Sequence, residues 1–276
     1  MFADYHVHTD YSDDSFHEME QVVLDAIEAG IDEIAITDHV DYGIKDDWSD
    51  VVTPRKRGKY LLANVDYPKY FSQISELQAK YAGKIVIKRG LEFGIQTHTV
   101  ARYEKLYRDW ELDFVILSIH QVGDLEFWTQ DYQAGKTQKA YNDGFYQELY
   151  DVITRFDRYS VLGHLDLIKR YDKAGVYPFE ESKEAITKIL KHVIAAGKGI
   201  ELNTSSFRYG LDDLMPSRDI LKLYHQLGGR IITIGSDSHE KAHLGAHIEA
   251  CKLELKEIGF THFCTFDRME PSFHEL

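Results

Sequence analysis

Short apolar stretches alternate with longer amphipathic stretches along almost the whole chain. The short stretches are rich in Val, Ile, Leu and Phe and are bounded by polar residues, which is typical of buried β-strands. We predict seven such strands, over residues 2–7, 33–37, 85–90, 114–118, 160–163, 199–202 and 231–234. A further apolar stretch over residues 262–266 predicts one more strand close to the end of the chain.

Between these strands, apolar positions recur every three to four residues, which is the period of an amphipathic helix. The predicted helices cover residues 18–29, 70–81, 138–156, 181–196, 217–227 and 242–257. Alternation of strands and helices predicts parallel strands joined by crossover helices. Seven such units favour a closed or nearly closed α/β barrel. An open, doubly wound sheet is the alternative, but no G-x-G-x-x-G motif follows a strand.

Length and composition narrow the class of protein. The chain has 276 residues, which suits a single barrel domain, and 43% of them are hydrophobic. The net charge is −14 and the Lys and Arg residues are scattered, so we expect no nucleic-acid partner. No apolar run approaches the roughly 18 residues of a membrane helix, and the first residues do not form a signal peptide.

The two cysteines, Cys251 and Cys264, lie outside any C-x-x-C motif. They are typical of free thiols in a reducing compartment, although one disulfide in a secreted chain is the alternative. We therefore expect a cytoplasmic enzyme with no membrane partner. The sequence leaves the oligomeric state open.

Nearly every predicted strand ends in or runs into a residue that can bind a metal ion. The stretches are His6-Val7-His8, Thr37-Asp38-His39, Gly90-Leu91-Glu92, Ser118-Ile119-His120, Gly163-His164-Leu165-Asp166, Glu201-Leu202-Asn203 and Gly235-Ser236-Asp237-Ser238-His239. The carboxyl ends of parallel barrel strands meet at one face, where barrel enzymes build their active sites. We therefore expect these side chains to converge in space, although they span the sequence.

The first of these stretches has a spacing that suits chelation. His6 and His8 are two residues apart, so on a strand both imidazoles point to the same face. Two imidazoles and a carboxylate from another strand can bind one divalent ion. A lone H-x-H pair is also found on half-exposed strands without any ion, but the recurrence of the pattern after the other strands favours a metal centre.

This ordered set of motifs resembles the PHP (polymerase and histidinol phosphatase) superfamily and, within it, the histidinol-phosphate phosphatases. The resemblance starts at Asp4-Tyr5-His6-Val7-His8-Thr9-Asp10-Tyr11-Ser12-Asp13-Asp14 and continues to His239. It implies a distorted (β/α)7 TIM-like barrel, with residues 1–276 as one phosphoesterase domain. It also implies hydrolysis of a small phosphomonoester, L-histidinol phosphate, in histidine biosynthesis. The expected mechanism is in-line attack by a hydroxide that bridges two metal ions.

The resemblance further implies three divalent ions, which could be zinc, manganese or iron. The expected ligands of the first ion are His6, His8, Glu92 and Asp237. Glu92 is expected to bridge to the second ion, whose other ligands are His120 and His164. The third ion is expected to bind His39, His239 and a carboxylate that follows the first motif. Asp13 and Asp14 are both candidates for that carboxylate, and the spacing from His8 favours Asp14.

Catalysis is expected to depend on Glu92 and Asp237, through the metals, and on two arginines. Arg170 and Arg208 follow the fifth and sixth strands, and guanidinium groups match phosphate oxygens with paired donors. The alternative is that they are surface arginines paired with Asp166 or Asp212. Trp128 is expected to pack on the substrate's imidazole or to anchor its own loop, and Asn203 is expected beside the substrate. Asp38 and Asp166 are expected to orient ligand imidazoles or loop backbone.

Two other interpretations stay open at this point. The same site could hydrolyse a nucleotide, sugar or tyrosine phosphate, or the chain could be a non-catalytic metal-binding regulatory protein. The long loop over residues 41–60 is a candidate lid over the site, or simply an insertion.

Overall fold

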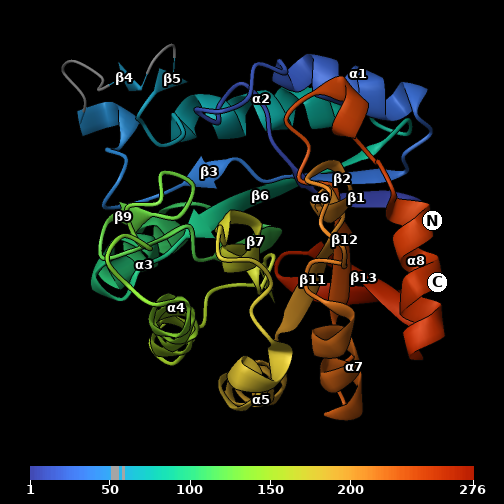
Figure 1. The fold of residues 1–276 in the computed structure, drawn as a ribbon. Helices are drawn as coiled ribbons and strands as arrows, with labels where there is room; N and C mark the ends of the chain where they lie inside the picture. Colours follow the sequence, from blue (N-terminus) through green and yellow to red (C-terminus); the bar gives the residue numbers. More distant parts are fainter. Residues whose placement is uncertain (51–55, 58–59) are drawn as a thin grey trace.

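The structure, a computed structural model, describes residues 1–50, 56–57 and 60–276. Seven parallel strands follow one another around a nearly closed, distorted TIM-like barrel (Figure 1). In spatial order they are β1 (Ala3–Val7), β2 (Glu33–Ile36), β6 (Val86–Gly94), β7 (Phe114–Ser118), β10 (Val161–Leu162), β11 (Gly199–Asn203) and β12 (Ile232–Gly235). A parallel bridge between Val7 and Ser238 joins the ends of the first and last strands. The predicted α/β barrel is therefore confirmed.

Helices surround the barrel and bury their apolar faces against it (Figure 1). They are α1 (Met19–Glu28), α2 (Tyr67–Lys80), α3 (Val100–Asp109), α4 (Gln138–Ile153), α5 (Phe179–Ala195), α7 (Arg218–Gln226) and α8 (Ile248–Ile258). In α5 the buried side chains Ile186, Ile189, Leu190 and Val193 recur at helical spacing. The side chains of Thr137 and Ser217 cap α4 and α7 by accepting backbone hydrogen bonds.

Short strands and helices lie at the face where the barrel strands end. They are β3 (His39–Val40), η1 (Trp48–Asp50), β4 (Lys56–Arg57), β5 (Tyr60–Leu61), η2 (Thr97–Thr99), β8 (Gln121–Val122), β9 (Leu125–Glu126), η3 (Leu167–Tyr171), α6 (Ser205–Arg208) and η4 (Lys241–His243). β3 pairs with β6, which brings His39 opposite Glu92. The candidate lid over residues 41–60 is described only in part, since residues 51–55 and 58–59 lie outside the described chain.

Several boundaries differ from the sequence prediction for identifiable reasons. β6 continues to Gly94, so Glu92 lies inside a strand rather than after it. The last helix begins at Ile248 rather than at residue 242, because Gly245 and His247 adopt left-handed backbone conformations that interrupt a helix. α3 was not predicted, and β13 (His262–Asp267) pairs with an unpredicted β14 (Glu270–Glu275).

Two further expectations concern the chain as a whole. Cys251 and Cys264 are buried and form no disulfide with each other. Among the described residues, no helix is long and apolar enough to cross a membrane.

Candidate metal centre

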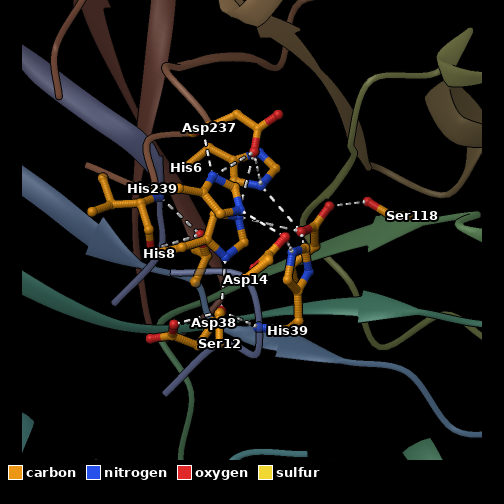
Figure 2. Close-up of polar contacts among 12 residues, drawn as sticks. His6, His8, Ser12, Asp14, Asp38, His39, Ser118, Asp237 and His239 are labelled. Carbon is orange, nitrogen blue, oxygen red and sulfur yellow. Dashed lines mark hydrogen bonds and ion pairs between the residues drawn. The ribbon is translucent and has the colours of Figure 1, made fainter. Parts of the chain in front are cut away.

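The predicted ligands converge at the carboxyl ends of the barrel strands, around a cavity of about 500 Å³. Figure 2 shows the labelled imidazoles and carboxylates turned toward one another, although their positions in the sequence run from His6 to His239. β6 contributes Glu92, which is fully buried at the centre of the group. The convergence follows from the barrel, because parallel strands all deliver their ends to one face.

The first donor group has two imidazoles and two carboxylates. Glu92 Oε2 lies 3.2 Å from His6 Nε2 and 3.6 Å from His8 Nε2. Asp237 Oδ1 lies 3.8 Å and 3.5 Å from the same two nitrogens. Four donors at such separations can surround one ion at the bond lengths of roughly 2.0–2.2 Å that zinc requires.

The second donor group forms around the other oxygen of Glu92. His164 Nε2 lies 2.8 Å from Glu92 Oε1, and His120 Nε2 lies 3.1 Å from it. Ser118 Oγ donates a hydrogen bond to the same oxygen at 2.7 Å, which fixes the rotation of the carboxylate. Glu92 therefore presents one oxygen to each of two donor groups, as a bridging ligand must.

The two neighbouring aspartates differ in their contacts with the third donor group. Asp14 Oδ2 lies 3.2 Å from His239 Nε2 and 3.5 Å from His39 Nε2. Asp13 instead binds the ammonium group of Lys45. The geometry therefore favours Asp14 as the third carboxylate ligand. His39 also contacts Glu92 through Nδ1, at 2.9 Å, so this group adjoins the first.

Unsatisfied polar atoms show that these donors suit a metal ion. Buried donors and acceptors nearly always have hydrogen-bond partners. Although several of them lie close to an opposite charge, six buried atoms of this cluster make no well-directed hydrogen bond among the described residues: His6 Nε2, His8 Nε2, His39 Nδ1, Glu92 Oε2, His164 Nδ1 and His239 Nε2. Imidazole nitrogens mixed with carboxylate oxygens are typical ligands of zinc, manganese and iron. The residues present therefore fit divalent metal ions.

Outer hydrogen bonds hold two imidazoles in the tautomer that metal binding needs. His6 Nδ1 donates to Glu201 Oε1 at 2.5 Å, and His120 Nδ1 donates to Asp41 Oδ1 at 2.7 Å. A carboxylate only accepts, so Nδ1 carries a proton, and in the neutral form that binds a metal the lone pair is on Nε2 and faces the cluster. Glu201 also accepts from the backbone N–H of His164 at 2.9 Å and so contacts two donor groups.

His8 is oriented through a hydroxyl group. Ser12 Oγ donates to Asp38 Oδ1 at 2.6 Å and can therefore accept a hydrogen bond from His8 Nδ1, 3.1 Å away (Figure 2). Asp38 also accepts from the backbone and side chain of Thr9, at 2.7 and 2.8 Å. Asp38 thus positions the loop after the first motif, as its predicted orienting role requires. Asp166 behaves similarly and accepts from the backbone N–H of Ser217 at 2.9 Å.

Two members of the first donor group, His8 and Asp237, have pKa values that suit metal binding. Burial lowers the pKa of His8, and the neighbouring imidazoles of His239 and His39 lower it further, so His8 is neutral. Burial disfavours the charged form of Asp237, but His6, His8 and the two arginines outweigh burial and hold its pKa well below the usual range. A neutral imidazole beside an ionised carboxylate is the state in which both can bind a metal.

Both predicted arginines line the cavity. Arg170 Nη2 lies 3.4 Å and Arg208 Nη2 lies 3.5 Å from Asp237 Oδ2, the oxygen that does not face the histidines. Arg208 also donates to the backbone oxygen of Ser236 at 2.7 Å, which fixes its guanidinium group. Neither arginine has the surface pairing with Asp166 or Asp212 that was the alternative. The two cations thus lie directly beside the first donor group.

The other two predicted substrate contacts differ in position. Trp128 lines the cavity and its side chain is 51% exposed, so it can contact a ligand. Asn203 is fully buried and does not line the cavity. Its amide donates to Glu201 Oε2 at 3.2 Å, and its Oδ1 accepts from the backbone N–H of Ser205 at 3.0 Å. Asn203 therefore supports Glu201, and its contact with the substrate stays a prediction.

Sequence reasoning missed the roles of Glu201, Asp41 and Lys45. Glu201 belongs to a recognised motif, but ligands were predicted at or just after strand ends, whereas Glu201 lies inside β11. It is two residues before Asn203 on the same face of the strand, which is the available signal. Asp41 and Lys45 lie in the loop after β3, and no strand or helix period marks them.

Comparison with known proteins agrees with this geometry. The family model described as the PHP domain matches residues 4–205, which is most of the chain. The chain therefore belongs to the PHP domain family.

Proteins named histidinol-phosphatase are among those similar to this chain. The histidinol-phosphatase of Lactococcus lactis is 31% identical over 272 residues, which cover 97% of this chain and 95% of that protein. The probable histidinol-phosphatase of Thermotoga maritima is 27% identical, with 94% and 93% of the two chains covered. The crystal structure of the Lactococcus lactis histidinol phosphate phosphatase, complexed with zinc, L-histidinol and phosphate, aligns with a TM-score of 0.82 at 29% identity and covers 98% of both chains.

Proposed function

We propose that this chain hydrolyses L-histidinol phosphate to L-histidinol and inorganic phosphate, a step of histidine biosynthesis. The observation that carries the proposal is the position of Glu92, whose two oxygens face two separate histidine groups beside a pair of arginines. Similarity to histidinol-phosphatases over nearly the full length of the chain supports the choice of substrate. We assign the activity to residues 1–276 as one unit.

The cofactors proposed are three divalent ions, held by the three donor groups described above. Zinc is the first choice because the similar Lactococcus lactis structure contains it, and manganese or iron would suit the same ligands. When bound, such ions lower the pKa of a coordinated water and neutralise charge on the phosphoryl oxygens. Phosphate monoesters need this help, since their uncatalysed hydrolysis is among the slowest reactions known.

The chain's own residues then have three tasks. Arg170 and Arg208 bind phosphoryl oxygens and orient the ester for in-line displacement. Asp237 holds the two guanidinium groups beside the first donor group, at 3.4 and 3.5 Å. Trp128 is proposed to pack on the imidazole of the substrate at the open side of the cavity. We place the reaction in the cytoplasm because both cysteines are free thiols.

Phosphate release measured on a panel of substrates tests the proposal. The purified, metal-loaded protein should release phosphate from L-histidinol phosphate with a kcat/KM at least about 100-fold above that for sugar, nucleotide and aryl phosphates. A difference of that size corresponds to about 2.7 kcal/mol of differential transition-state binding. Comparable rates on all the esters would reject the substrate assignment and leave a phosphatase of other specificity.

A further inference from the structure

Lys45 is a buried cation at the edge of the cavity, and nothing in the proposed chemistry uses it. It is only 6% exposed and lines the cavity beside Asp13 and Asp41. Its ammonium group binds Asp13 Oδ1 and lies 2.8 Å from Asp41 Oδ2. A buried lysine is costly unless carboxylates neutralise it. Two carboxylates already do so here, which leaves the ammonium group no free charge for a phosphate.

Each of the two carboxylates is next to a predicted metal ligand. Asp13 directly precedes Asp14, whose Oδ2 faces His239 and His39 in the third donor group. Asp41 accepts a hydrogen bond from His120 Nδ1 at 2.7 Å, and His120 belongs to the second donor group. Lys45 therefore connects the loop that carries one ligand with the carboxylate that orients another.

The surrounding backbone is built to keep these contacts in place. The backbone N–H of Lys45 donates to the carbonyl oxygen of Asp41 at 2.8 Å, so one tight turn presents both side chains together. Gly94 has no side chain and so leaves space for the hydrogen-bonded pair of Asp41 and His120. A Cβ atom at this position would lie 1.9 Å from Asp41 Oδ1 and 2.8 Å from His120 Nδ1. Asp41 N–H is itself fixed by donation to Asn64 Oδ1 at 2.9 Å.

From this geometry we infer that Lys45 is a positioning residue that couples two metal sites, by fixing the Asp13–Asp14 loop and the Asp41–His120 pair relative to each other. The inference deepens the proposed function and rests on it for the identity of the ligand-bearing groups. Without the ammonium group, the carboxylates of Asp13 and Asp41 lose the positive charge that they share and repel each other. Both neighbouring ligands then lose their fixed positions, and such outer partners typically contribute 10- to 100-fold to metal affinity.

Zinc binding to the full-length protein tests this coupling. Zinc dissociation constants would be measured by equilibrium dialysis against buffered zinc for wild type, Lys45→Met and Lys252→Met. Lys252 is a matched control because it is 7% exposed and bound to Glu249 and to the Met1 carbonyl oxygen, and it does not line the cavity. We expect at least tenfold weaker zinc binding in Lys45→Met and a change below twofold in Lys252→Met. Zinc affinity equal to wild type in a folded Lys45→Met protein overturns the inference.

Two further variants test the Lys45–Asp13 and Lys45–Asp41 contacts separately. They also test the inference if Lys45→Met does not fold. Asp13→Asn should lower the affinity for the zinc ion at the third donor group, because it releases the loop that carries Asp14. Asp41→Asn should lower the affinity for the zinc ion at the second donor group, because it no longer orients His120. Unchanged zinc affinity in both variants would also overturn the inference. In folded Lys45→Met, kcat for L-histidinol phosphate should fall at least tenfold while KM changes less than threefold, because the neutralised ammonium group does not bind phosphate.

The zinc titration also keeps this inference separate from the proposed function. If metal-loaded wild type releases no phosphate from L-histidinol phosphate, the proposed function fails. The zinc affinities of the Lys45 and Lys252 variants still decide whether Lys45 positions the metal ligands.

Discussion

At the scale of single residues, Glu92 is the group on which the metal centre depends most. Its two oxygens lie within 3.6 Å of donor nitrogens from five histidines: His6, His8, His39, His120 and His164. Burial alone would raise the pKa of Glu92, but His6, His120 and His39 outweigh burial and hold it well below the usual range. The carboxylate is therefore ionised and able to bridge two ions.

Replacement of Glu92 by Ala should remove catalysis without removing the fold. Metals contribute several kcal/mol to phosphoryl transfer, and each 1.36 kcal/mol is tenfold in rate, so kcat should fall about 1,000-fold or more. Metal content per chain, measured by mass spectrometry of the elements, should fall in the same sample. Activity near the wild-type rate in a folded Glu92→Ala protein would contradict the bridging assignment.

Arg208 tests the phosphate contact. In Arg208→Met we expect a higher KM and a kcat/KM lower by about 10- to 100-fold, as for loss of one charged hydrogen-bond donor of about 1.5–3 kcal/mol. Arg108→Met is the matched control, because Arg108 lies on α3, away from the cavity, and pairs only loosely with Glu104, at 4.0 Å. Steady-state kinetics identical for the two variants would return Arg208 to a purely structural role.

At the scale of elements, β6 connects the barrel with the metal centre. It is the longest strand of the sheet and pairs with β2, β3 and β7. Gly90 and Gly94 lie on either side of Glu92 on the same face, and both have neighbours too close for a side chain. Glu92 therefore lies between two glycines whose missing side chains make room for neighbouring groups. The backbone oxygen of Ile36 approaches Gly90, and the side chains of Asp41 and His120 approach Gly94.

Gly94→Ala should therefore weaken metal binding at the His120 group. The added methyl group must displace Asp41 or His120, since both atoms it meets lie within 2.8 Å. Gly199→Ala provides the control, because its Cβ atom would lie 2.4 Å from the backbone oxygen of Ile231. Gly199 is the first residue of β11, at the end of the strand opposite to the metal centre. Thermal unfolding should show both proteins destabilised, while zinc titration should show a loss only in Gly94→Ala. Equal zinc affinity in the two would argue against the role of Gly94.

α1 is attached to its surroundings by a buried carboxylate. Asp25 accepts from His17 Nε2 and Lys241 Nζ, both at 2.9 Å. Burial raises its pKa, but hydrogen bonds from Lys241, Gln21 and His17 outweigh burial, and the net pKa lies below the normal 3.8.

A depressed folded-state pKa means that Asp25 stabilises the fold above its unfolded pKa of about 3.9 and loses that effect as the pH falls through the folded value. Asp25→Asn should lower the free energy of unfolding by about 1–2 kcal/mol at pH 7. The difference from wild type should shrink below pH 4. Denaturant titrations at both pH values measure it, and a difference that grows in acid would contradict the assignment.

At the scale of the whole molecule, the sequence was informative wherever one strand ended in one reactive side chain. The barrel needs only alternation of strands and helices, and convergence of His8, Glu92 and Asp237 then follows from strand ends meeting at one face. The sequence did not predict the roles of Glu201, Asp41 and Lys45. Their contacts depend on side chains inside strands and on the conformation of a loop, which the sequence pattern does not specify. Asn203 is fully buried and does not line the cavity, so its contact with the substrate stays a prediction.

We propose that the protein hydrolyses L-histidinol phosphate and would need bound metal ions to do so. The most direct measurement is phosphate release from that ester by one protein sample, before chelation, after chelation and after zinc is added back, with metal content determined at each step. We predict that activity disappears with the metal and returns with it. Undiminished turnover by protein stripped of metal, or no turnover by fully loaded protein, would contradict the account.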